Sequence, residues 1–236
     1  MTAMPRRSLH PIRRRIKLIA LFIGVLALSA CIFLPDFAGQ RKAGKYEPVD
    51  LDQDPRPRAT AGPARPEQQT EPHTCGWHAM RSLYTAYGLD PDDFGLRFRL
   101  GTDQPAMRAD KDSTGTLHPD LYRVLAQDGF VAEVFDFDRA LPADHLDLHL
   151  SNNQLALAVV YRSTYHWVLL TPGDKPGRVR VIDSLIAEPV DTDAAAFVDE
   201  ALSITLVRPA KPGETVSTAD AHAAGLTEMR RLYQRK

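Results

Sequence analysis

The stretch QTEPHTCGWHAMRSLYTAYG, residues 69–88, decides the fold predicted for this chain. Apolar and aromatic side chains recur every three or four positions from Trp77 to Tyr87, which is the spacing of a helix with one buried face, and Gly88 follows as a terminator. A helix is therefore expected over 75–87, with Cys75 at its first position. A thiol at a helix start is either a small packing residue or a nucleophile.

Downstream of this helix the sequence changes from helical to strand periodicity. Branched and aromatic residues gather in short runs after residue 150, and the turn-forming segment PGDKPG at 172–177 joins two of these runs as a hairpin. Helices that precede strands are typical of an α+β domain with helices packed on an antiparallel sheet. We predict helices over 93–99, 119–127, 193–202 and 217–234, and strands over 130–137, 155–161, 165–171, 178–183 and 204–207.

The beginning of the chain has the pattern of a membrane-targeting segment. Several basic residues precede the first acidic one, and 18–34 then carries no charge. As a helix this run would rise about 26 Å, close to the thickness of a thin bilayer. The basic residues would stay in the cytoplasm and the rest of the chain would lie outside. A buried core helix is the weaker interpretation, because such a helix would have a polar face.

Two forms of membrane attachment fit this segment. An uncleaved transmembrane anchor over 18–34 is favoured, because residues 32–34 (IFL) continue the apolar run. Alternatively, residues 28–31 (LSAC) resemble a bacterial lipobox, in which Cys31 would carry a lipid after signal cleavage. Both alternatives place the protein at the bacterial inner membrane, with its C-terminal domain facing the periplasm or the exterior.

Composition divides the remaining chain. Seven of the 18 prolines fall from Pro35 to Pro72 among few large apolar residues, so 35–66 is predicted to be a disordered tether. The apolar fraction of 44% and the charged fraction of 25% are those of a globular protein, and a net charge of −1 gives no reason to expect a nucleic-acid partner. The predicted divisions are a cytoplasmic basic segment (1–17), the anchor or signal (18–34), the tether (35–66), the folded domain (67–210) and a C-terminal tail or helix (211–236).

Cys75 is the only cysteine of the predicted domain, and its position favours reactivity over packing. The other cysteine, Cys31, lies in or at the membrane, so an intramolecular disulfide is not expected. Free N–H groups and the dipole at a helix start favour a thiolate. Gly76 is expected to leave space beside the sulfur for a substrate backbone. A nucleophilic thiol also needs a base, and the base needs an orienting partner.

His166 and Asp183 are the candidates for base and orienting partner. His166 opens the apolar strand that continues with Trp167, and Asp183 closes the following strand. In an antiparallel hairpin the start of the first strand lies beside the end of the second, so the two side chains are expected to meet. The alternatives for each residue taken alone are a structural histidine and a turn-forming aspartate.

Together these motifs resemble the papain-like cysteine peptidases, and most closely the bacteriocin-processing, or double-glycine leader, peptidases. That family has a glutamine six residues before a Cys-Gly pair, then a histidine that opens an apolar strand, then an aspartate in the next strand. The resemblance covers about 67–208 and implies a papain-like fold and a thiol protease. It implies Cys75 as nucleophile, His166 as general base and then acid, Asp183 as its orienting partner, and Gln69 with the Cys75 N–H as oxyanion hole.

The sequence also departs from this family. It lacks the phosphate-binding loop of the ATP-binding domain to which transporter-fused members are joined, and the domain is expected to face outward. Residues 69–72 and 89–91 also resemble phytochelatin synthases, which are acyl transferases. A catalytically silent peptide-binding module of the same fold is the third alternative.

The expected ligands and partners follow from these assignments. We expect a peptide or protein substrate and the membrane as partners, and no nucleic acid. Protein partners are not indicated by the sequence. No cofactor is expected, and the dispersed histidines show no zinc-ligand spacing.

Overall fold

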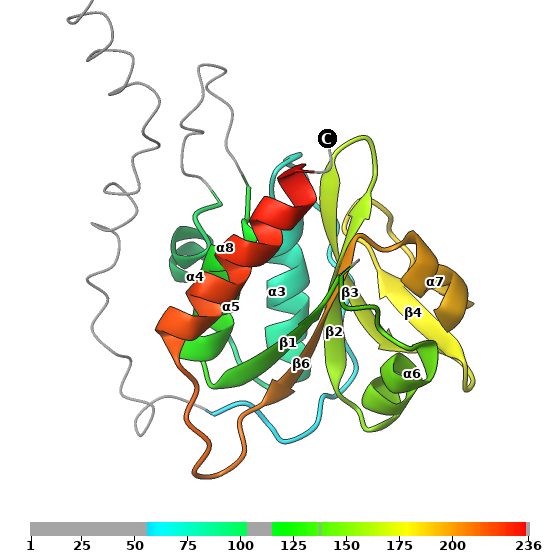
Figure 1. Cartoon of the computed structure of the whole chain (residues 1–236), viewed down its shortest axis with the longest axis horizontal. Helices are drawn as coiled ribbons and strands as arrows, with labels where there is room; N and C mark the ends of the chain where they lie inside the picture. Colours follow the sequence, from blue (N-terminus) through cyan, green and yellow to red (C-terminus); the bar gives the residue numbers. More distant parts are fainter. Residues whose placement is uncertain (1–55, 103–114, 137, 235–236) are drawn as a thin grey trace, which may run out of the picture. The chain divides into compact units, whose positions relative to one another are not determined.

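The computed structural model describes residues 56–102, 115–136 and 138–234 (Figure 1). Contacts divide the chain into two units, Met1–Glu47 and Pro48–Lys236, and the description here concerns the second. The predicted anchor or signal over 18–34 lies outside the described residues. Among the residues that are described, no helix has both the length and the apolar character needed to cross a membrane.

The centre of the domain is one antiparallel sheet of six strands in the order β1-β6-β2-β3-β4-β5. The β2–β3–β4 part is a meander, and its second hairpin is the one predicted from the PGDKPG turn. β6 returns between β1 and β2, so β1 and β5 are the two edge strands of the sheet. The strands are β1 (Phe130–Phe135), β2 (Leu155–Tyr161), β3 (Tyr165–Pro172), β4 (Arg178–Ile182), β5 (Val190–Asp193) and β6 (Ser203–Pro209).

Helices cover both faces of the sheet (Figure 1). One face carries α3 (Cys75–Ala86), α4 (Asp93–Arg99), α5 (His118–Gln127) and α8 (Thr218–Gln234), and the other carries α6 (Ala143–Ser151) and α7 (Ala194–Glu200). Strand β2 shows why two cores form, because its alternate side chains enter different apolar clusters. The cluster that includes α3 takes Leu155, Leu157 and Val159. The cluster of the α6 and α7 face takes Ala156, Ala158 and Val160.

The prediction of helices packed on an antiparallel sheet is confirmed. Most element bounds differ from the predicted ones by two residues or fewer. Two elements were not predicted. α6 was missed because most of its residues are polar, as in a loop. Only Leu146 and Leu150 are buried. β5 is a four-residue edge strand held by β4 alone, and its VDTD sequence has no apolar alternation.

Residues 56–66 differ from the prediction of a disordered tether. Three backbone N–H groups here donate to the domain: Arg58 to the Tyr87 carbonyl at 2.9 Å, Ala61 to Asn153 at 2.7 Å and Gly62 to Ala86 at 2.8 Å. The composition of the segment prevents a core of its own, but main-chain hydrogen bonding does not depend on apolar side chains. This part of the predicted tether therefore lies on the domain.

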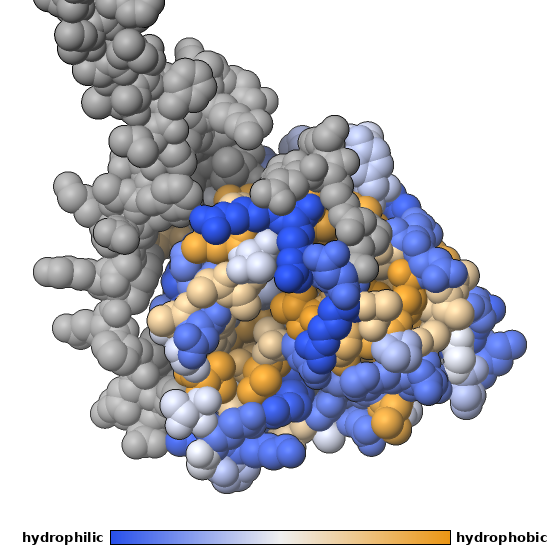
Figure 2. Space-filling model, in the orientation of Figure 1, coloured by the Kyte–Doolittle hydropathy of each residue, from blue (hydrophilic) through white to orange (hydrophobic). Residues whose placement is uncertain are grey.

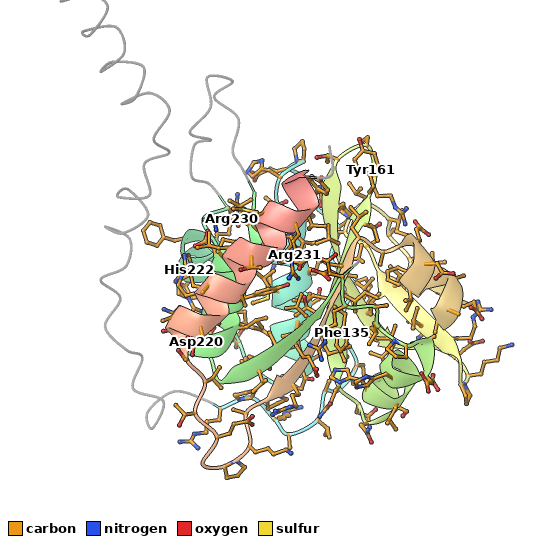
Figure 3. All side chains as sticks on the ribbon, in the orientation of Figure 1. Phe135, Tyr161, Asp220, His222, Arg230 and Arg231 are labelled. Atoms are coloured by element: carbon orange, nitrogen blue, oxygen red, sulfur yellow. The ribbon has the colours of Figure 1, made fainter. Side chains whose placement is uncertain are left out.

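The C-terminal helix packs lengthwise on α5 (Figure 1). A Cβ at Gly225 would lie 2.5 Å from the Pro119 Cα, so only glycine permits this close approach. Arg231 lies on α8 (Figure 3). Its Nη1 lies 2.6 Å from Asp136 Oδ2, and the Tyr165 hydroxyl donates to the Leu232 carbonyl at 3.0 Å. On the face seen in Figure 2, hydrophilic and hydrophobic residues are interspersed. The predicted tail helix is thus part of the packed domain.

Candidate active site

Cys75 is the first residue of α3 and is 7% exposed. Thr74 precedes it, but the Thr74 hydroxyl donates backward to the Glu71 carbonyl at 2.8 Å and does not cap the helix. Thr74 is at the N-cap position, where a side-chain oxygen often accepts a hydrogen bond from the first N–H groups of the helix, but here it makes no such bond. This end of α3 favours negative charge on the sulfur, as a nucleophilic thiol requires.

Gly76 has a different role from the predicted one. A Cβ at this position would lie 2.4 Å from the Thr116 Cβ, so the glycine permits close packing against the segment before α5. The Trp167 indole N–H donates to the Thr116 carbonyl at 3.0 Å and fixes the same segment from the sheet. The expectation of space for a substrate backbone at Gly76 was wrong, because Thr116 occupies that space.

His166 and Asp183 meet as the hairpin predicts. Leu169 pairs with Ile182, and this register brings the start of β3 beside the end of β4. The His166 Nε2 lies 2.7 Å from Asp183 Oδ1, and the two side chains are 3% and 6% exposed. A buried contact of this length fixes both the orientation of the imidazole and the nitrogen that faces the carboxylate.

The imidazole of His166 also interacts with Cys75. Burial lowers the pKa of His166, but hydrogen bonds with Asp183 and with the Cys75 thiol, and the charges of both groups, raise it to about 9. Because Nε2 faces Asp183, Nδ1 is the nitrogen left for the sulfur. Low exposure of Cys75 alone would fit a packing cysteine. Its contact with a paired histidine is what distinguishes it.

Asp183 is held in its ionised form. Burial opposes ionisation, but the hydrogen bond to His166 and the backbone N–H of Leu185, 2.9 Å from Oδ1, lower the pKa of Asp183. The charges of His166 and Arg162 act in the same direction, and the Arg162 Nε lies 4.0 Å from Asp183 Oδ2. Arg162 was not singled out in the sequence, since a charged residue in a hairpin turn carries no distinctive signal.

Gln69 is held at the turn that leads into α3. Its backbone N–H donates to the Ser184 carbonyl at 2.8 Å, and its side-chain Nε2 donates to the Glu71 carbonyl at 3.1 Å. That carbonyl also accepts from the Thr74 N–H at 3.2 Å, so the Gln69 amide lies at the residues that directly precede Cys75. The neighbouring Gln68 is exposed, whereas Gln69 is half-buried.

The remaining histidines described near the site have other partners or surroundings. His78 lies 3.4 Å from Glu67, and burial lowers the pKa of His78. His118 is buried with its ring centroid 4.6 Å from that of Trp167, and burial lowers the pKa of His118 to about 3. In the part of the chain that the structure describes, no group of three or more His, Cys, Asp or Glu could hold a metal ion.

Comparisons with known proteins give a similar arrangement of helices and sheet. No protein-family model matches the sequence, and no curated protein matches it. A double-glycine-motif protease from an AMS/PCAT transporter, solved in complex with the leader peptide, is 12% identical with a TM-score of 0.45, and the match covers 66% of this chain and 99% of that chain.

Two further solved structures are similar. The peptidase domain of Streptococcus ComA, a bifunctional ABC transporter of a quorum-sensing pathway, is 13% identical with a TM-score of 0.44, over 62% of this chain and 99% of that chain. The N-terminal peptidase C39-like domain of a toxin secretion ATP-binding protein from Vibrio parahaemolyticus is 13% identical with a TM-score of 0.37, over 58% and 97%. Likeness at this level concerns the fold, and the chemistry rests on the side chains described above.

Proposed function

We propose that the domain is a papain-like cysteine peptidase that hydrolyses peptide bonds through Cys75, His166 and Asp183, with Gln69 as oxyanion donor. The observation that carries the proposal is the buried chain of contacts from Asp183 through His166 to Cys75. A carboxylate that orients a histidine, which in turn contacts a thiol at a helix start, is the arrangement that activates a nucleophile.

The reaction follows from this arrangement. The thiol proton moves to His166, and the sulfur attacks the carbonyl carbon of the peptide. Negative charge then develops on the carbonyl oxygen, where the Gln69 amide and the Cys75 backbone N–H stabilise it. The imidazolium of His166 gives its proton to the departing amine, which leaves an acyl-enzyme. Water attacks that thioester with His166 as base, and the acid product leaves with the thiol restored.

Replacement of the nucleophile tests the proposal. We expect Cys75→Ala to abolish cleavage of a tryptic peptide library prepared from bacterial proteins, measured as new peptide termini by mass spectrometry, while the melting temperature stays within a few degrees. Cys31→Ser is the matched control, because it removes the other cysteine and should leave cleavage intact. Cleavage by Cys75→Ala at the wild-type rate would reject the proposal.

Two alternatives are outcomes of the same experiment. Acyl transfer would give products joined to an added amine or thiol acceptor in place of acids. A catalytically silent binding module would retain library peptides without cleaving them, and its Cys75 would react with iodoacetamide no faster than a free peptide thiol.

We also propose that the domain works outside the cytoplasm, attached to the membrane by residues 18–34 or through a lipid on Cys31. The supporting observation is the uncharged run that follows a basic segment in the sequence.

A further inference from the structure

Gln69 and Ser184 are joined twice, although 115 residues separate them. The Gln69 backbone N–H donates to the Ser184 carbonyl at 2.8 Å, and the Ser184 hydroxyl donates to Gln69 Oε1 at 2.6 Å. Ser184 is 5% exposed and directly follows Asp183. One short segment therefore holds both the carboxylate that orients His166 and the hydroxyl that contacts the Gln69 amide.

These contacts fix the orientation of the Gln69 side-chain amide, that is, which end accepts from Ser184 and which end donates to Glu71. A glutamine amide has one accepting end and one donating end, and a rotation of about 180° exchanges them. Ser184 engages the accepting end, and the Glu71 carbonyl takes one N–H of the donating end at 3.1 Å. The role proposed for the second N–H of Nε2 is to donate to the oxyanion that would form at Cys75.

We propose that Ser184 is a positioning residue that orients the Gln69 amide toward the oxyanion formed at Cys75. The inference rests on the proposed peptidase function and adds to it a residue that none of the motifs includes. Ser184 acts through Gln69 and touches no reacting atom.

The expected loss of oxyanion stabilisation in Ser184→Ala follows from the hydrogen bond that the Ser184 hydroxyl donates to Gln69 Oε1. Removing an oxyanion donor altogether lowers kcat by about 10²- to 10³-fold. Without the Ser184 hydroxyl, the partly buried Oε1 of Gln69 loses its partner, and the amide shifts to recover one. We therefore expect Ser184→Ala to weaken oxyanion stabilisation by about 5- to 30-fold, less than the loss of Gln69 itself.

A peptide aldehyde measures this effect directly. In the full chain, the Cys75 sulfur adds to the carbonyl carbon of acetyl-Gly-Gly-glycinal, the C=O π electrons move to oxygen, and the thiol proton passes to His166 and on to that oxygen. The hemithioacetal oxygen occupies the oxyanion position. Its dissociation constant is measured by protection of Cys75 from iodoacetamide. Alkylation by iodoacetamide alone forms no oxyanion, so its rate should not change in Ser184→Ala.

A double-mutant cycle tests whether the effect of Ser184 on aldehyde affinity depends on Gln69. Ser184→Ala should lower the affinity for the aldehyde when Gln69 is present and should lower it no further in the Gln69→Ala variant. Ser184→Thr, which keeps a hydroxyl, should retain most of the wild-type affinity. Ser82→Ala is the matched control, because Ser82 is also buried. Its hydroxyl donates to the Arg65 carbonyl at 2.9 Å, so it ties the same N-terminal segment to α3 through a residue other than Gln69.

The outcomes separate the two proposals. Unchanged aldehyde affinity in Ser184→Ala, additive losses with Gln69→Ala, or an equal loss in Ser82→Ala would each overturn the role of Ser184 and leave the peptidase proposal standing. A wild-type chain that forms no aldehyde adduct and has an unreactive Cys75 would instead overturn the peptidase proposal and this inference with it.

Discussion

At the scale of single residues, the contacts of His166 with Asp183 and Cys75 change the pKa of its imidazole. The pKa of His166 is raised to about 9 from an ordinary 6.5, against the effect of burial. We expect the imidazole resonances of His166 to titrate near pH 9 in an NMR experiment. Asp183→Asn should move the midpoint downward by more than one pH unit, because the largest favourable contact is lost while burial remains.

The same shift has a consequence for stability. A group whose folded pKa is raised binds its proton more tightly in the folded state, so the contribution of His166 is fully present below about pH 6.5 and is lost as the pH rises through about 9. His118 serves as an internal control, since burial lowers the pKa of His118 to about 3 and its resonances should not move between pH 5 and 10. A His166 midpoint near 6.5 in the wild type would contradict the geometry of the pair.

At the scale of elements, α8 buries a carboxyl group against the rest of the domain. Glu228 is 2% exposed, and burial together with its hydrogen bond to Asp136 and the charge of Asp136 raises its pKa to about 8. The folded state therefore binds a proton that the unfolded state releases above about pH 4.5, and stability should fall as the pH rises from there to about 8. Glu228→Gln should raise the melting temperature by several degrees at pH 9 and little at pH 4.

The matched control is a carboxyl group that lies exposed on the same helix. Asp220 is exposed in the first turn of α8, so Asp220→Asn should shift the melting temperature by a similar small amount at both pH values. A pH-independent effect of Glu228→Gln would show that the pKa of Glu228 is the same in the folded and the unfolded protein.

At the scale of the whole molecule, attachment to a membrane is the prediction that most affects where the domain works. We expect the full chain to sediment with bacterial membranes and to be degraded by protease added to spheroplasts, and a chain without residues 1–55 to remain in the aqueous fraction. Cys31→Ser separates the two alternatives by mass: a chain that loses a lipid and regains residues 1–30 indicates a lipoprotein, and a full-length chain in both forms indicates a transmembrane anchor. A full chain in the aqueous fraction would reject both.

The sequence predicted the elements whose periodicity is strong and missed those whose stability comes from neighbours. The apolar spacing from Trp77 to Tyr87 fixed the length of α3 within one residue, and the PGDKPG turn fixed the β3–β4 hairpin. α6 and β5 were missed because few of their side chains are buried. The packing role of Gly76 was also missed, since Thr116 lies 40 residues away and no local pattern links the two.

The sequence by itself determined which residue types were available for chemistry and, through the hairpin, that His166 and Asp183 would meet. Strand register is a local property, because a tight turn and alternating side chains fix it. Only the tertiary structure decided that the start of α3 lies against this pair and that Ser184 holds the Gln69 amide. Such contacts depend on how helix and sheet pack across the core, and residue spacing along the chain does not encode that distance.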